Sequence, residues 1–314
     1  MQPLVTMHDL SSIITPELLK RMVDGRFPWP RTEPVSHRSM LEEFFGTDEN
    51  FTKAARVAWP ALKALSNIGP DVIPDLTKVL PPPDDKTYPE QAIGLHILVD
   101  QAPRVLFHGI DARWVSYFDK VVEELFDTQS KLPKKLQPWQ PERWSDASFE
   151  YWVIVHSTWN SALTHRESVA KQQEALQMGE DNRVAIEKWS GKKDPARGDD
   201  SIRKDIYAFP KLVTVIDFDD FDTFEDVGFF MCKVTDVHKP VIDHFGRYPN
   251  RNAIEGRDST DEEKDWIEKV DHFAEAPPDV AKRVREDIDA GKWTPLGEGG
   301  SSFMTGLHID IHTS

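Results

Sequence analysis

The sequence predicts an all-helical protein, and three observations support this prediction. Residues 90–103 carry apolar side chains around most of a helical circumference, which is typical of a central, buried helix. Residues 148–178 form a long segment with helical periodicity. Residues 259–263 (Ser-Thr-Asp-Glu-Glu) have the composition of a capping box at the start of a further helix.

The N-terminal part, from Pro3 to about Ala64, is predicted to form short helices that prolines separate. Within it, residues 27–30 (Phe-Pro-Trp-Pro) form a rigid aromatic turn that we expect to pack on the core. Residues 80–87 (Leu-Pro-Pro-Pro-Asp-Asp-Lys-Thr) are expected to be a non-helical linker.

The linker leads into the buried helix. Thr87 is placed to cap it, Pro89 suits its first turn, and Glu90 can reach back to the backbone N–H of Thr87. Pro103 is expected to end or kink the helix. Its C-terminal end presents three polar residues: Asp100, Gln101 and Arg104.

Further helices are expected over 114–128 and 148–178, and over 278–290 with Gly291 as the residue that follows its end. The long helix places three residues on one face: His156, Asn160 and Leu163. The capping box pairs Ser259 with Glu262 or Thr260 with Glu263. We therefore expect one helical domain over 1–314, with a glycine-rich tail over 296–314 that is mobile unless it is docked.

Residues 177–236 have a different composition. They are charged and interrupted by glycine as far as Lys204, and then rich in phenylalanine and aspartate. Val213, Val215 and the phenylalanines are expected to be extended or to form loops.

Charge and cysteine content exclude several classes of protein. The net charge of −16 disfavours a nucleic-acid partner, because such proteins concentrate lysine and arginine against phosphates. No apolar run is long enough to cross a membrane, so no membrane association is expected. The single cysteine, Cys232, forms no internal disulfide and fits a reducing, cytoplasmic setting. It is more consistent with a small buried apolar residue than with a nucleophile.

Motifs for common cofactors are missing from the sequence, including a Walker A loop, HExxH, paired CxxC and GxGxxG, so we expect no cofactor. The acidic run 217–222 can in principle gather Mg²⁺ or Ca²⁺ through its carboxylates. A solvated acidic loop is the preferred interpretation, and no metal site is predicted.

Two groups of polar residues match motifs of a known family. Residues 100–105 read Asp-Gln-Ala-Pro-Arg-Val, close to the family's typical Asp-Gln-Phe-Pro-Arg-Asn, with Ala102 and Val105 as the departures. Residues 156–159 read His-Ser-Thr-Trp where His-Ser-Glu-Asp is typical, so Thr158 and Trp159 replace both acids.

A third and longer match covers residues 238–263. It keeps most of the family's characteristic residues: His238, Phe245, Gly246, Arg247, Pro249, Arg251, Asn252, Gly256, Arg257, Ser259 and Thr260. Asn250 stands where histidine is usual. By these three motifs the chain resembles the DUF924 family, as a divergent member.

The resemblance implies a TPR-like helical array or bundle of undefined biochemistry. The sequence shows no internal repeat of about 34 residues, so a TPR-like arrangement rests on the resemblance alone. The resemblance also implies a shorter connection before the third motif. Residues 177–236 are therefore expected to be a long irregular insertion or lid.

The departures from the family motifs predict a reshaped pocket between helices. We expect Trp159, Ala102 and Val105 to line it, because these residues make the region less acidic and more apolar. Four polar residues are expected at its edge: Arg104, Arg247, His156 and His238. Such a pocket suits a small, mostly apolar molecule that bears a carbonyl or carboxylate.

An alternative interpretation is purely structural. Arg104, Arg247 and Arg251 can be internal struts that tie helix ends together, with Asp100 as a partly buried counter-ion. His156 alone can equally be a hydrogen-bonded core histidine.

The preferred hypothesis is a cofactor-independent enzyme that catalyses a cyclisation or isomerisation. Arg104 or Arg247 would polarise the substrate, and His156 or His238 would transfer a proton. The expected substrate contacts are Asp100, Gln101, Ala102, Val105, Trp159, Asn250, Arg251 and Asn252. The alternative function is a TPR-like scaffold that binds a protein or peptide. A third possibility is that the motifs are architectural and function lies in 177–236.

Overall fold

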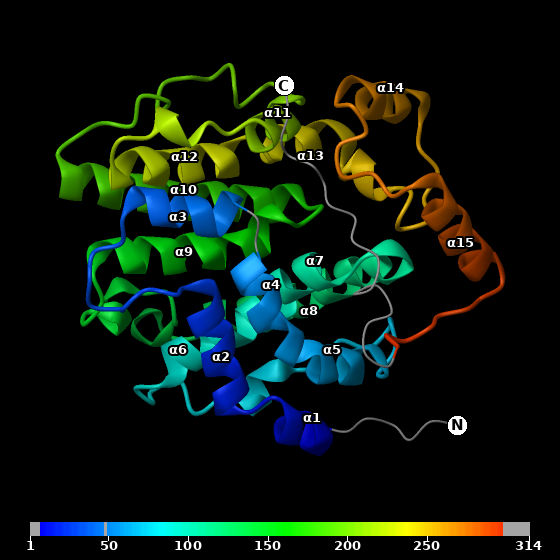
Figure 1. Cartoon of the computed structure of the whole chain (residues 1–314), viewed down its shortest axis with the longest axis horizontal. Coiled ribbons are helices and arrows are strands. Elements are labelled where there is room, and N and C mark those ends of the chain that lie inside the picture. Colours follow the sequence, from blue (N-terminus) through cyan, green and yellow to red (C-terminus); the bar gives the residue numbers. More distant parts are fainter. Residues whose placement is uncertain (1–6, 47–48, 298–314) are drawn as a thin grey trace.

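The structure, a computed structural model, describes residues 7–46 and 49–297, and this part of the chain is helical without any strand (Figure 1). The predicted all-α fold is confirmed. The α-helices are α1 (Met7–Ile13), α2 (Pro16–Arg26), α3 (His37–Phe45), α4 (Glu49–Ala55), α5 (Trp59–Ser66), α6 (Tyr88–His96), α7 (Ala102–Leu106), α8 (Trp114–Ser130), α9 (Phe149–Thr164), α10 (Val169–Ser190), α11 (Ala208–Thr214), α12 (Phe224–Asp236), α13 (Lys239–Phe245), α14 (Asp261–Lys269) and α15 (Pro278–Asp289).

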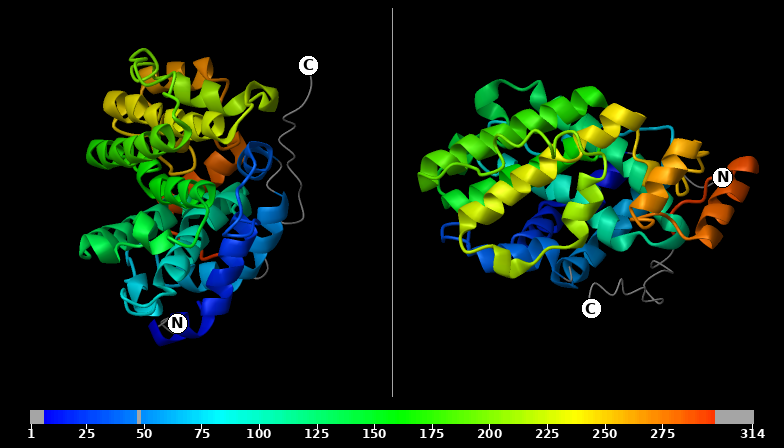
Figure 2. Two further views of the ribbon diagram at one scale, coloured as in Figure 1. Left: turned by 90° about the vertical axis from the view of Figure 1, so that its left-hand side faces the viewer. Right: turned by 90° about the horizontal axis from the view of Figure 1, so that it is seen from above.

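The helices α9, α10 and α12 pack side by side in one half of the molecule, with α3 lying against α12 (Figures 1 and 2). In the other half, α2 packs on α6 and on α4. Gly94 of α6 permits the close approach of α2, because a Cβ atom there would lie 2.5 Å from the carbonyl oxygen of Leu19. One large apolar core joins the two halves, and α13 and α14 enclose a second, smaller core around Trp266.

The central helix passes through Pro103 instead of ending there. A π-helical stretch, η3 (Ile97–Gln101), lies between α6 and α7, and the N–H of Ala102 bonds the carbonyl of Ile97. The wider turn compensates for the N–H that proline lacks, so the helix continues to Leu106. The helix also starts differently from the prediction, since Asp85 accepts the hydrogen bond from the N–H of Thr87 (2.7 Å).

The predicted long helix over 148–178 is wrong, because it breaks into α9 and α10 at residues 165–168. The Ser168 side chain accepts from the Lys171 N–H to begin α10. Buried Gln172 donates to the carbonyls of Thr164 (2.8 Å) and Arg166 (2.9 Å), so the carbonyls at this break are satisfied by a side chain. Apolar periodicity continues on both sides of the turn, so the sequence pattern predicted one continuous helix.

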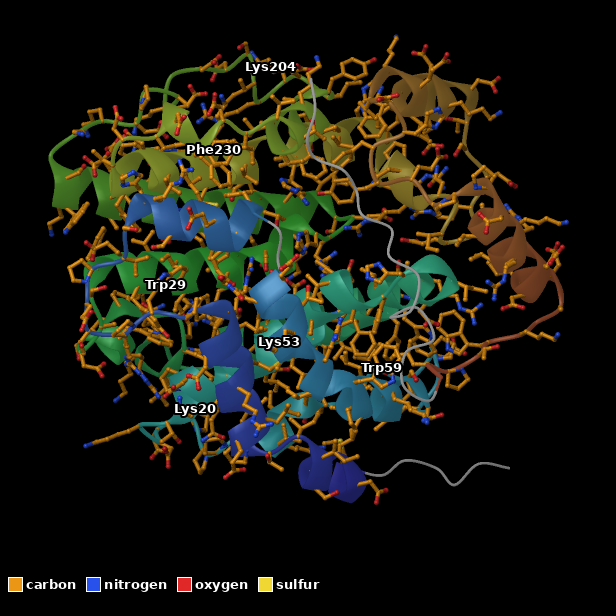
Figure 3. The ribbon with its side chains drawn as sticks, viewed as in Figure 1. Lys20, Trp29, Lys53, Trp59, Lys204 and Phe230 are labelled. Atoms are coloured by element: carbon orange, nitrogen blue, oxygen red, sulfur yellow. The ribbon has the colours of Figure 1, made fainter. Side chains whose placement is uncertain are left out.

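Residues 177–236 are more helical than expected. Residues 177–190 continue α10, and residues 224–236 form α12, so only 191–223 is largely irregular. Of the phenylalanines expected to be extended or in loops, Phe224, Phe229 and Phe230 are helical in α12, whereas Phe221 is irregular as expected. Phe230 (Figure 3) meets Phe45 with ring centroids 5.4 Å apart. The apolar face of α12 is buried against α9 and α10, and this packing outweighs the local preference of aromatic residues for extended backbone.

Other local predictions hold. Thr260 and Glu263 form both bonds of the capping box, and Gly291 after α15 has a positive φ of 62°. Phe27 is buried against Tyr151, as expected of the aromatic turn. Of the predicted tail, Leu296 is buried and Gly297 accepts from the Trp59 indole, whereas 298–314 lie outside the described residues. None of the helices in the described ranges is long and apolar enough to cross a bilayer.

Candidate functional site

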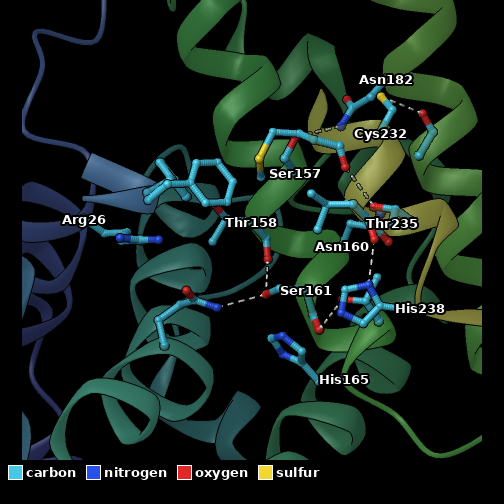
Figure 4. Close-up of a pocket in the computed structure, with 17 residues that line it drawn as sticks. Arg26, Ser157, Thr158, Asn160, Ser161, His165, Asn182, Cys232, Thr235 and His238 are labelled. Carbon is cyan, nitrogen blue, oxygen red and sulfur yellow. Dashed lines mark hydrogen bonds between the residues drawn. The ribbon is translucent and has the colours of Figure 1, made fainter. Parts of the chain in front are cut away.

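A cavity of about 200 Å³ lies among α3, α9, α10 and α12 (Figure 4), and Arg26 of α2 and Gln101 of η3 also line it. Part of its lining is apolar and comes from Phe44, Phe45, Met231, Cys232 and Val234. The rest is polar, and His165 and His238 lie close together there. A cavity of roughly 150 Å³ holds benzene, so this one has room for a small ring.

His165 belongs to a buried hydrogen-bonded pair with Asp100. Its Nδ1 lies 3.2 Å from Oδ1 of Asp100, and the second carboxylate oxygen accepts from the Ser161 hydroxyl (2.7 Å) and from Gln101. Burial opposes ionisation of Asp100, but the charge of Arg104 and the hydrogen bond from His165 hold its pKa well below the usual range. The ionised carboxylate only accepts, so Nδ1 of His165 carries the proton and Nε2 is left with its lone pair.

His238 has the same tautomer for a different reason. Its Nδ1 lies 2.7 Å from the backbone carbonyl of Val234, which can only accept, so Nδ1 is protonated. The ring packs on Phe209 at a tilt of 39°, with centroids 4.0 Å apart, and its centroid lies 6.4 Å from that of His165. Neither Nε2 atom has a hydrogen-bond partner among the described residues.

Burial keeps both rings neutral. It lowers the pKa of His238 to about 3, with the neighbouring His165 adding to the effect. It also lowers the pKa of His165, and the charge of Arg104 lowers it further. At neutral pH the cavity therefore presents two neutral imidazoles, each with a basic nitrogen free to bind a ligand.

Behind Asp100 lies a second buried carboxylate, Asp119 of α8. It binds three guanidinium groups, those of Arg104 (2.6 Å), Arg166 (2.9 Å) and Arg251 (3.0 Å). Burial alone would raise the pKa of Asp119, but these charges hold it at about 2. Arg104 bridges the two carboxylates, since it also lies 3.1 Å from Asp100.

The observed contacts of the arginines are those of the structural alternative, in which arginines tie helix ends together. Arg251 donates to the carbonyl of His165 (3.1 Å) and so ties the end of α9 to the third motif. Arg247 lies elsewhere, paired with Glu263 (2.6 Å) at the start of α14. Neither residue, nor Arg104, lines the cavity.

The residues expected to form an apolar lining do not line this cavity. Trp159 and Ala102 are fully buried in the main core, where Trp159 packs against His96 with centroids 4.7 Å apart. Val105 packs on the same core, and His156 is buried beside Trp152. None of these four residues lines the cavity, because their side chains leave α9 and α7 on faces that pack against other helices.

Of the remaining predicted residues, Gln101 and His238 line the cavity and Asp100 supports it from behind. Asn250 and Asn252 are buried in the third motif, where Asn252 donates to Ser259 (3.0 Å). The structure thus brings together Asp100, Gln101, Arg104, Arg251 and His238, and separates them from Arg247 and His156.

Three residues of the site were missed in the sequence: His165, Ser161 and Asp119. His165 stands in Thr-His-Arg-Glu, a dense polar run within what looked like an apolar helix, and that run was the available signal. Asp119 had no such signal, because a single carboxylate in an amphipathic helix is ordinary.

The acidic run 217–222 lies on the surface. Asp219 pairs with Arg38 (3.1 Å), and the Asp217 side chain accepts from the Asp219 N–H (2.9 Å). Across residues 7–46 and 49–297, no group of three or more histidine, cysteine or acidic side chains is arranged to hold a metal ion.

Comparison with known proteins identifies a family but indicates no activity. No curated protein and no solved structure matches the chain. A family model described as "bacterial protein of unknown function" matches residues 74–271, more than half of the chain and a span that includes Asp100, His165 and His238. The protein therefore belongs to the DUF924 family.

Proposed function

We propose that the protein is a cofactor-independent enzyme that binds a small, largely apolar molecule in the cavity and moves a proton on it, in an isomerisation or a cyclisation. One observation carries the proposal, namely the Asp100–His165 pair at the end of a partly apolar cavity. A cytoplasmic setting fits it, because the one cysteine is a free, buried thiol.

In this proposal His165 acts as the general base. Nε2 takes a proton from the substrate, and the resulting imidazolium is stabilised by the Asp100 carboxylate. The same Nε2 returns the proton to another atom of the substrate, so protons balance over the reaction. His238 holds the substrate with its own Nε2. The arginines that we expected to bind a carbonyl or carboxylate have carboxylate partners instead, so they take no direct part.

The experiment has two stages. The purified protein is incubated with a small-molecule extract, and retained compounds are identified by mass spectrometry. These compounds are then incubated with the protein in D₂O, and deuterium incorporation or rearrangement is followed by NMR. We expect turnover by the wild type and a loss of at least about 100-fold in His165→Gln.

The matched control is His272→Gln, because His272 is an exposed histidine that pairs with Glu275. It should behave as the wild type. Retained compounds that return unchanged and without deuterium would show that the cavity binds but does not catalyse.

The same retention experiment tests the alternative function, a scaffold for a protein or peptide. The polar side chains of the cavity are hard for a peptide to reach, since Asn160 and Asn182 are each 3% exposed. Retention of no small molecule, together with specific binding of a protein, would favour the scaffold.

A further inference from the structure

The hydrogen-bond donors and acceptors of the cavity are satisfied to different degrees. At the end formed by Gln101, Ser161 and the two histidines, the polar hydrogens are bound within the protein. Gln101 donates both amide hydrogens, to Asp100 and to Ser161 (3.1 Å), and Ser161 donates to Asp100. The two Nδ1–H groups are held by Asp100 and Val234.

The acceptors at the same end are not used. Nε2 of His165 and Nε2 of His238 have no donor among the described residues, and the same is true of Oε1 of Gln101. At the other end, Nδ2 of Asn160 donates to Thr235 (3.1 Å) and Nδ2 of Asn182 donates to Ser157 (3.0 Å). Both amide oxygens there are buried without a partner.

A buried acceptor without a donor costs roughly 1–3 kcal/mol, so a ligand that supplies donors gains by entering this cavity. A carboxylate or a ketone supplies only further acceptors, and Arg26, the cation of the lining, already donates to the carbonyl of Glu43 (3.2 Å). An ammonium group would meet an unfavourable charge, because Arg104, Arg166 and Arg251 exceed the two carboxylates that they bind.

We infer that the ligand of this cavity is a neutral hydroxyl-bearing ring compound, in the class of a cyclic alcohol or diol. This inference rests on the proposed function, and it replaces the carbonyl or carboxylate expected from the sequence. The ring packs against Phe44, Phe45 and Met231, and the hydroxyl hydrogens bind the two Nε2 atoms. Nε2 of His165, the general base of the proposed function, then accepts the hydrogen bond of one hydroxyl group.

Four probes of similar size test it: cyclohexane-1,2-diol, cyclohexanol, cyclohexanone and cyclohexanecarboxylate. Affinities are measured by NMR titration of protein with ¹⁵N-labelled histidine. The diol should bind most tightly, roughly tenfold better than the ketone and the carboxylate. It should also shift the Nε2 resonances of His165 and His238, which His165→Gln and His238→Gln assign.

His238→Phe keeps a ring to pack on Phe209 and removes the acceptor, so the affinity for the diol should fall to that for cyclohexanol. Asn160→Leu serves as a second variant, since it removes an unpartnered oxygen at the other end. His272→Phe is the matched control and should change no affinity.

The outcomes separate the two proposals. Equal or tighter binding of the ketone or the carboxylate, with the same histidine shifts, overturns the hydroxyl inference and leaves the cavity as a binding site. Failure of all four probes to shift either histidine overturns the cavity as a site for ring-sized molecules, and the proposed function with it.

Discussion

The Asp100 carboxylate and the His165 imidazole lie 3.2 Å apart although 65 positions separate them in the chain. The π-helical stretch at Ile97–Gln101 places Asp100 on one side, and the end of α9 places His165 on the other. Arg104 bridges this pair to Asp119, and Asp119 binds Arg251 of the third motif. The contacts that shape the cavity end are therefore continuous with those that join the two cores.

Asp119→Asn should strongly destabilise the fold. The substitution leaves Arg104, Arg166 and Arg251 facing one another with one buried carboxylate lost. Removing one partner of a buried ionic group costs roughly 3–5 kcal/mol, and urea unfolding at neutral pH measures it. Asp24→Asn is the control, because its pair with Lys20 is exposed and worth about 1 kcal/mol or less. Equal losses in the two variants would contradict the prediction.

Gly94→Ala should destabilise the protein although alanine is the better helix former. The new Cβ would lie 2.5 Å from the carbonyl oxygen of Leu19, so α2 would have to move away from α6. We expect a loss of about 1–3 kcal/mol in thermal or urea unfolding. Gly198→Ala is the matched control, because nothing lies within 4 Å of its Cβ position. A stabilised Gly94→Ala protein would show that helix propensity outweighs the contact between α2 and α6.

Stability should fall as the pH is lowered from 6.5 towards 4. Burial lowers the pKa of His96 and of His156 to about 4 and that of His238 to about 3. The unfolded chain takes up protons on these rings near pH 6.5 whereas the folded chain does not, so acid favours unfolding. Each such histidine lowers the free energy of unfolding by about 1.4 kcal/mol for each pH unit of acidification within this window.

Urea unfolding at pH 7, 6, 5 and 4.5 measures this dependence. His156→Gln should reduce the slope of unfolding free energy against pH by about one proton. The exposed His272→Gln lacks a buried ring to remove and should keep the slope between pH 6 and 4.5 close to that of the wild type. An unchanged slope in His156→Gln would mean that His156 titrates normally in the folded protein.

Cys232 should react slowly with thiol reagents in the folded protein. Burial raises the pKa of its thiol to about 12, and Sγ lies 3.4 Å from the carbonyl of Gly179. The thiolate fraction at pH 8 is then lower by roughly 1,000-fold than in the unfolded chain. Alkylation rates with iodoacetamide, with and without urea, check this directly, since the chain has no other cysteine. Similar rates in both conditions would show that the cavity is open to the reagent.

Local signals in the sequence were dependable where a structure forms within a few residues. The Thr260–Glu263 capping box and Gly291 after α15 lie where they were expected. The turn at 165–168 was missed because its stabilising bonds come from the side chain of Gln172, which local propensity does not reveal. Asn250, Arg251 and Asn252 of the third motif were expected to contact the substrate. Much of it instead joins two cores, as when the Tyr248 hydroxyl donates to the carbonyl of Thr164 (2.5 Å).

The sequence by itself determined the helical fold, the acidic character and the family, because periodicity, capping and motif spacing are properties of neighbouring residues. Only the tertiary structure decided which polar residues meet. It paired Arg104 and Arg251 with carboxylates, placed Trp159 in the core, and left Nε2 of His165 and of His238 as acceptors in a cavity. The physical reason is that the partner of a buried polar group is fixed by the packing of distant helices, and one turn at 165–168 was enough to redirect it.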